Sequence, residues 1–237
     1  MIPSPPSLAM EKFILIETST SLCSAALAED GKIVSFRSCE REHSAMTAPF
    51  IKEMLDEQGW KTGDCSAVGV SMGPGSFTGL RVGVSTAKGL CFGAGIPLIA
   101  AGSLDTLVWQ AKEEGLLPEG CTAVVPMIDA RRMEVYTAVF SPSGERLTEV
   151  EPKIIEAGAY AGLLEHGPVL FIGDGAEKCR EAIAHPDAHF AGCRPKATAM
   201  LSPVRQAFAA GRFEDTAYFE PFYLKDFVAT VSRKKLF

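Results

Sequence analysis

The sequence VGVSMGPGSFTGLRVG, residues 68–83, contains the strongest structural signal of the chain. The apolar residues Ala67–Met72 predict a buried strand, and a helix is expected from the following turn through about Gly93. The turn between them, residues 73–79, is rich in glycine, which permits positive φ angles and the close approach of another backbone. The stretch therefore predicts a strand, a tight turn and a helix in succession.

The N-terminus of that helix has free N–H groups and a positive dipole, so the turn is a candidate for phosphate binding through Gly73, Gly75 and Ser76. The formal motifs are absent. No Lys follows the glycines at the Walker A spacing, and Thr78 stands where a dinucleotide-binding fingerprint needs Gly. A tight turn into a closely packed helix is therefore the favoured interpretation, and any phosphate site is expected to be vestigial.

The residues before the turn predict a hairpin meander and a helix. Strands are expected at Lys12–Thr18, Ser24–Ala28 and Ile33–Ser38, with Asp30-Gly31 as the hairpin turn between the last two. A helix from Ser44 to Gln58 has apolar residues on one face. After the glycine-rich helix, a strand at Pro97–Ala101 precedes a helix that begins near Ser103.

The second half repeats this order about 100–110 residues later. Three strands are expected near Thr122–Ile128, Glu134–Phe140 and Leu147–Val150. Helices are then expected at Glu156–Glu165, Ala176–Ala184 and Ala199–Gly211, separated by strands at Val169–Ile172 and around Phe190.

The repeat predicts an α/β protein of two ribonuclease-H-like lobes, each a mixed sheet with flanking helices, as in the actin-like ATPase fold. Residues 1–10 are expected to be a disordered leader. The two lobes are expected at 11–110 and 111–215, with a C-terminal segment, 216–237, that returns to the first lobe.

Composition excludes several classes of protein. The chain has 237 residues, 47% of them hydrophobic, and a formal net charge of −6, which argues against a disordered chain and against a protein that binds nucleic acid on its own. Seven cysteines without a C-x-x-C pair indicate reduced, mostly buried thiols in a cytoplasmic protein. The uncharged runs are too short for a membrane span, which needs ~20 apolar residues.

Five segments, in order, resemble the TsaB (YeaZ) family of bacterial proteins, which is needed for N6-threonylcarbamoyladenosine (t6A) at position 37 of tRNAs reading codons that begin with A. The segments are Ile14–Leu27, the His43-Ser44 helix entry, Gly69–Leu90, Ile128–Arg131 with Glu134–Phe140, and Pro221–Phe227. The resemblance implies a two-lobed actin-like fold. It also implies a noncatalytic subunit that forms a heterodimer with the catalytic paralogue TsaD, acts with the ATPase TsaE, and forms a homodimer when alone.

By the same resemblance, the partner surface lies on the helices at 44–58 and 76–93. The chain is then expected to contact tRNA only indirectly, through the complex. It is expected to bind ATP or ADP only at a shared interface within that complex. The residues expected at the partner surface are Met46, Phe50, Met54, Ser76, Thr78, Gly79, Arg81, Val82, Gly83 and Thr86.

No catalytic or metal-binding residue is expected. The paralogue's metal-binding His-x-x-x-His pair aligns with Ser103 and Leu107, and the acidic pair of catalytic relatives aligns with Ser21 and Leu22; none of these can replace the ligands. The alternatives are a degenerate nucleotide-binding protein, a metal-dependent hydrolase of the actin-like fold, including a peptidase, and a homodimeric scaffold.

Three further features carry a structural and a functional interpretation. Asp129 beside Arg131 and Arg132 is expected to form a salt bridge at a strand end rather than to bind a ligand. His43 is expected to cap a helix or contact a partner. The basic residues 233–235 are either solvated or in contact with tRNA.

Overall fold

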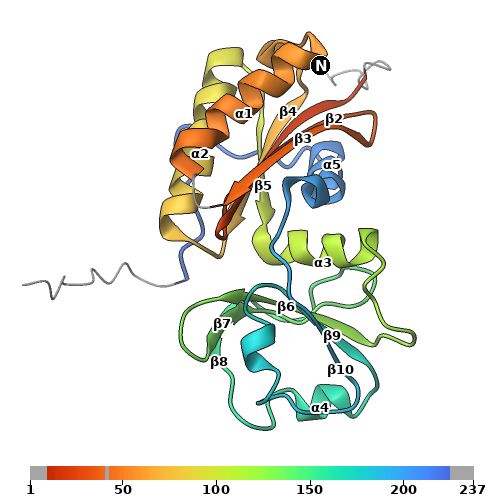
Figure 1. Ribbon diagram of the computed structural model, residues 1–237. Helices are drawn as coiled ribbons and strands as arrows, with labels where there is room; N and C mark the ends of the chain where they lie inside the picture. The colour runs from red at the N-terminus through yellow and green to blue at the C-terminus, as the bar shows by residue number, and fades with distance from the viewer. Residues whose placement is uncertain (1–9, 41–42, 225–237) are drawn as a thin grey trace, which may run out of the picture.

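The computed structural model describes residues 10–40 and 43–224 and consists of two lobes (Figure 1), each built on a five-stranded mixed sheet. The expected leader, except for Met10, and the basic residues 233–235 lie outside the described residues, as do the side chains of His43 and Ser44. Among the described residues, no helix is both long and apolar enough to cross a membrane.

The first sheet has the order β3-β2-β1-β4-β5. Its antiparallel part is the predicted meander, in which Asp30 and Gly31 have φ angles of 46° and 79° and form the turn. β4 and β5 pair in parallel through a helical crossover. The strands are β1 (Lys12–Glu17), β2 (Leu22–Glu29), β3 (Lys32–Glu40), β4 (Ala67–Gly73) and β5 (Leu98–Gly102).

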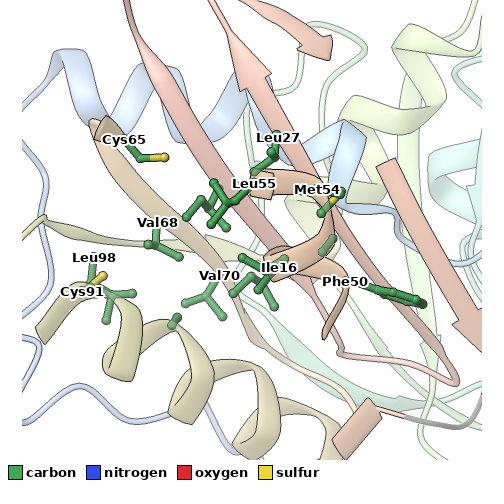
Figure 2. Close-up of a cluster of buried hydrophobic side chains, with 14 of the residues drawn as sticks. Ile16, Leu27, Phe50, Met54, Leu55, Cys65, Val68, Val70, Cys91 and Leu98 are labelled. Atoms are coloured by element: carbon green, nitrogen blue, oxygen red, sulfur yellow. The ribbon is translucent and has the colours of Figure 1, made fainter. Parts of the chain in front are cut away.

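Two helices, α1 (His43–Gln58) and α2 (Phe77–Ala94), cover one face of this sheet (Figure 1), and the short 3-10 helix η1 (Thr62–Asp64) follows α1. Their apolar residues pack on alternate residues of β1 and β2, since successive strand residues point to opposite faces. Figure 2 shows this core, in which Ile16 and Leu27 of the sheet meet Phe50, Met54 and Leu55 of α1.

The second sheet, β10-β9-β6-β7-β8, repeats the connectivity of the first, so the predicted duplication of two actin-like lobes is confirmed. Its strands are β6 (Ala123–Asp129), β7 (Glu134–Thr137), β8 (Glu151–Ile154), β9 (Val169–Ile172) and β10 (Ala188–Ala191). The third strand lies later than the expected 147–150 because Thr137 of β7 pairs with Glu151.

Two predicted helices of the second lobe are wrong. Of 156–165, only α4 (Ala161–Leu164) is helical, since Gly158, Tyr160 and Gly167 have positive φ angles. Of 176–184, only the 3-10 turn η2 (Glu177–Cys179) forms.

The helices α3 (Ser103–Glu113) and α5 (Leu201–Ala209) pack against the other lobe than the one expected from their position in the sequence. α3, expected largely within the first lobe, buries Leu104, Leu107 and Val108 in the core of the second. α5, preceded by the 3-10 helix η3 (Ala197–Met200), falls within 111–215, yet Leu201 and Val204 pack against the first sheet. α5 covers the sheet face opposite α1 and α2 (Figure 1). Each lobe is thus completed by a helix placed at the junction.

After α5 the chain stays on the first lobe and runs beside α2 (Figure 1). The Nζ of Lys88 in α2 donates to the carbonyl oxygens of Ala217 and Phe219, at 3.0 Å each. The backbone N–H of Phe222 donates to the carbonyl of Met72 at the end of β4, at 2.7 Å. The described part of the C-terminal segment therefore reaches the glycine-rich turn.

Candidate functional site

The glycine-rich turn packs against the loop after β1. The backbone N–H of Ser76 donates to the carbonyl of Ser19 at 2.6 Å, and the side chain of Ser76 caps α2 by accepting from the N–H of Gly79 at 3.2 Å. A Cβ on Gly75 would overlap the same Ser19 carbonyl. Two donors near the N-terminus of α2 are therefore used within the protein.

A cleft of about 860 Å³ lies between the lobes beside this turn. One wall comes from the first lobe, the other from the β6–β7 turn, and the C-terminal segment closes one side. The lining residues are Ser19, Thr20, Ser21, Pro74, Gly75, Ser76, Phe77, Thr78, Ile128, Asp129, Ala130, Arg131, Arg132, Glu134, Tyr136, Asp174, Phe222, Tyr223 and Leu224.

A buried carboxyl group lies in the sequence just before the residues Ser19–Ser21 that line the cleft. Glu17, the last residue of β1, is fully buried, and its Oε1 accepts from the N–H of Ser19 at 2.6 Å. Burial raises its pKa to about 7, and the hydrogen bond from the backbone N–H of Ser19 limits the rise. The Oε2 of Glu17 and the Oγ of Ser19 have no hydrogen-bond partner. Our sequence reasoning missed Glu17, although an acidic residue in the apolar run KFILIE was a signal.

The expected salt bridge of Asp129 at the strand end is confirmed, although its partner is not a neighbouring arginine. Asp129 instead pairs with Lys178, whose Nζ also donates to the carbonyls of Arg132 at 2.6 Å and Glu134 at 2.7 Å. Arg131 and Arg132 follow with left-handed φ angles of 73° and 52°. Lys178 thereby holds the turn at the cleft wall, and sequence reasoning missed it because it lies far away in the chain.

The structure places no metal site among its described residues. Within 10–40 and 43–224, no three His, Cys, Asp or Glu side chains are arranged to hold a metal ion. Ser103 and Leu107 are buried in α3. His189 lies in β10, and the Nδ1 of His185 accepts from the N–H of Asp187 at 3.1 Å.

Several residues predicted for the partner surface are inside the lobe, which corrects that prediction. Phe50 and Met54 are 7% and 0% exposed, and Met46 packs on the same core. Gly79 and Gly83 are buried against Thr18. A Cβ at either glycine would overlap an atom of Thr18, so one of the two would have to shift. An apolar helix face opposite a sheet is buried by that sheet, and a small-residue face serves close packing within the chain.

The other predicted residues reach the surface of α2. Ser76, Thr78 and Arg81 are exposed, and Val82 and Thr86 are half-buried. The guanidinium of Arg81 lies 4.1 Å from the ring centre of Phe77, and its Nε donates to the hydroxyl of Tyr223 at 3.3 Å. These residues remain candidates for contact with a partner.

A second hollow, which we call the α1–α2 groove, has a volume of about 360 Å³. Apolar side chains form most of its wall, and Thr86 is the predicted surface residue that lines it. Phe92, two residues after Leu90 on a different side of α2, is 87% exposed. The lining residues are Ala48, Ile51, Lys52, Leu55, Asp56, Trp60, Lys61, Thr62, Thr86 and Leu90.

Two sheets of the same connectivity, with flanking helices around an interlobe cleft, define a protein of the two-lobed actin-like class. Component A of the (R)-2-hydroxyglutaryl-CoA dehydratase of Acidaminococcus fermentans shares this fold, with a TM-score of 0.50 at 10% identity over 84% of this chain and 98% of that chain.

Closer similarities identify the family. The family model for TsaD, tRNA N6-adenosine threonylcarbamoyltransferase, matches residues 34–232. The Escherichia coli tRNA threonylcarbamoyladenosine biosynthesis protein TsaB is 32% identical over 92% of this chain and 96% of its own length; the Bacillus subtilis protein is 34% identical over 68% and 69%. YeaZ from Pseudomonas aeruginosa superposes with a TM-score of 0.76 at 27% identity, covering 91% of this chain and all of that one. The chain belongs to the TsaB (YeaZ) family.

Proposed function

We propose that this chain is the noncatalytic activating subunit for t6A modification of adenosine 37 in tRNAs reading codons that begin with A. It acts as a heterodimer with the catalytic subunit TsaD, together with TsaE. The names of its relatives support a role in t6A biosynthesis. The match to the TsaD family model supports a common origin with the proposed catalytic partner.

The α1–α2 groove is the observation that carries this proposal. Trp60, Thr86 and Leu90 line a largely apolar hollow between two helices. Apolar and aromatic side chains concentrated in this way are typical of the buried centre of a protein interface. Helices of a partner built on the same fold would pack here, and a second copy of this chain would use the same surface when the partner is absent.

The chemistry is assigned to the partner. Ser103 and Leu107 provide no metal ligands where the paralogue has its histidine pair. The inward hydrogen bonds of Ser76 and Gly79 support a vestigial role for the phosphate-binding turn at Gly73, Gly75 and Ser76. ATP or ADP would then be held only within the complex, at a shared interface. The net charge of −6 fits a cytoplasmic subunit whose partner supplies most of the RNA-binding surface.

The test places a charge on the groove without disturbing the core. Ala48 is exposed on α1 and lines the groove, so Ala48→Arg adds a long cation at the proposed interface. Ala209, exposed on α5 at the opposite face of the sheet, provides the matched control Ala209→Arg. Calorimetric titration with purified TsaD should show affinity reduced at least about tenfold by Ala48→Arg, roughly 1.4 kcal/mol, and unchanged by Ala209→Arg.

Equal affinity of the two variants would show that the groove is not the interface. The noncatalytic role has a separate test, reconstituted t6A transfer with TsaD and TsaE. The groove variant should lose transfer in proportion to its lost binding. Substitution of Ser76 by Ala should leave the transfer rate within about twofold once binding is saturated, since no side chain of this subunit enters the chemistry.

A further inference from the structure

Cys23 and Cys39 face each other across the hairpin of β2 and β3. They are direct partners in the antiparallel register of the two strands. Cys23 shares its strand face with Ala25 and Leu27, which lie in the core beneath α1. Cys39 packs against that same core, so both thiols point to the α1 side of the sheet.

The spacing of such a pair suits a disulfide. Directly opposite residues of an antiparallel pair have Cα atoms about 4.5 or about 5.5 Å apart, depending on whether they exchange hydrogen bonds. Both values lie within the ~4.4–6.8 Å range over which cysteines are bridged. A bond between Cys23 and Cys39 therefore requires rotation of side chains and no shift of the strands.

The other five cysteines lack this arrangement. In the strand registers of the two described sheets, no further pair of cysteines is opposed. Cys65 and Cys91 are buried in the core of the first lobe outside its strands, and Cys179 is buried in the core of the second. Cys193, half-buried after β10, is a suitable control thiol of similar accessibility to Cys39.

We propose that Cys23 and Cys39 are a redox-responsive pair that forms a reversible disulfide with a small-molecule disulfide as oxidant. The thiolate of Cys39 attacks one sulfur of the oxidant, breaks its S–S bond and releases one thiolate. The thiolate of Cys23 then attacks the Cys39 sulfur of the mixed disulfide and releases the second. Two protein thiols are oxidised, one small disulfide is reduced to two thiols, and the protons of the protein thiols end on the released groups.

The order of these steps follows from burial. Cys23 is fully buried, and this burial raises its thiol pKa to about 11, whereas Cys39 is partly exposed. The thiolate is the attacking form, so the accessible Cys39 reacts first and Cys23 resolves the mixed disulfide. Closure should therefore be slow at neutral pH and accelerate as the pH rises.

The bond would alter the support of α1. The Sγ of Cys23 now lies 3.3 Å from the Oγ1 of Thr47, a hydrogen bond between the sheet and α1. Rotation of the sulfur toward Cys39 breaks it. Because α1 forms one wall of the α1–α2 groove, oxidation is expected to weaken partner binding, a consequence that rests on the proposed function.

The first test needs no partner. The wild-type chain is incubated with oxidised glutathione, free thiols are alkylated, and peptides are mapped by mass spectrometry with and without reduction. A peptide that joins Cys23 to Cys39, removed by dithiothreitol and retained in Cys193→Ser, is expected. Separate glutathione adducts, or alkylation of both thiols, would overturn the proposal. Since the mapping uses the wild-type chain, it does not depend on a variant folding.

The second test addresses α1. Oxidised and reduced wild-type chains are titrated with TsaD, beside Cys39→Ser treated with the same oxidant. Weaker binding by about threefold or more in the oxidised wild type alone supports the coupling to α1. Equal binding after complete cross-linking rejects that coupling, while loss of all TsaD binding in the reduced chain would instead count against the proposed function.

Discussion

The carbonyl oxygen of Thr18 lies so close to Gly79 that a Cβ on the glycine would overlap it. The first turn of α2 rests directly on the end of β1 at this point. A methyl group here would meet backbone, which cannot rotate away as a side chain can. Gly79 is thus required by the packing of the first lobe rather than by contact with a partner.

Replacement of Gly79 by Ala should therefore lower the free energy of unfolding by about 1–3 kcal/mol, the usual cost of overpacking. Gly89 lies in the same helix with open space around it. Gly89→Ala should raise stability by about 0.5–1 kcal/mol, because alanine favours a helix. Urea unfolding of both variants measures the difference, and equal effects would show that α2 does not rest on Thr18 in solution.

The buried carboxyl of Glu17 predicts a pH dependence of stability. Its folded-state pKa of about 7 exceeds the ordinary glutamate value of 4.5, so the folded protein binds this proton more tightly than the unfolded chain. Stability from this group is present below pH 4.5, falls as the pH rises toward 7, and is lost above 7. The shift corresponds to roughly 3 kcal/mol.

Glu17→Gln keeps an oxygen to accept from the N–H of Ser19 and removes the charge. The stability gained by this variant over wild type should be larger at about pH 8 than at about pH 5, in urea titrations at both pH values. A gain that is the same at both pH values would show that Glu17 is not buried in its charged form.

Lys178 is expected to keep the β6–β7 turn ordered at the cleft wall. Lys178→Met removes the donor to Asp129 and to the carbonyls of Arg132 and Glu134, and should cost about 1–2 kcal/mol. Amide hydrogen exchange should quicken across the β6–β7 turn. Lys52→Met, which breaks only the exposed pair with Asp56, should leave stability close to that of the wild type. Unchanged exchange in the turn of Lys178→Met would contradict this role.

Lys88 is expected to hold the described part of the C-terminal segment against α2. Lys88→Met removes the hydrogen bonds to Ala217 and Phe219, so chymotrypsin should cleave near Phe219 several times faster. Lys112→Met provides the control, since Lys112 donates to the carbonyl of Ser143 in the second lobe. Equal cleavage rates in the two variants would show that other contacts hold the segment.

The order of elements in the first lobe could be predicted because its signals are local. Asp30-Gly31 between apolar runs indicated the hairpin, and the apolar stripe of 44–58 indicated a helix. The second lobe was predicted less well. Single residues such as Tyr160, with a φ angle of 64°, interrupt an apparently helical pattern, and only the surrounding packing imposes that conformation.

The partner of each surface residue could not be predicted in the same way. Periodicity shows that Phe50 and Met54 share a face, but a buried face and a docking face have the same composition. Likewise, a salt bridge of Asp129 at the strand end was predicted from the local charges, but its partner, Lys178, lies 49 residues away.

The sequence by itself determined the two-lobed fold class and the family, because hydrophobic periodicity, turn residues and the glycine-rich stretch are local and ordered along the chain. Only the tertiary structure decided that Gly79 and Gly83 pack against Thr18, that α3 and α5 join the lobes, and that Cys23 lies opposite Cys39. These relations depend on strand register and on contacts between distant residues. Such contacts form only when distant segments are brought together in the folded chain, so no single segment specifies them.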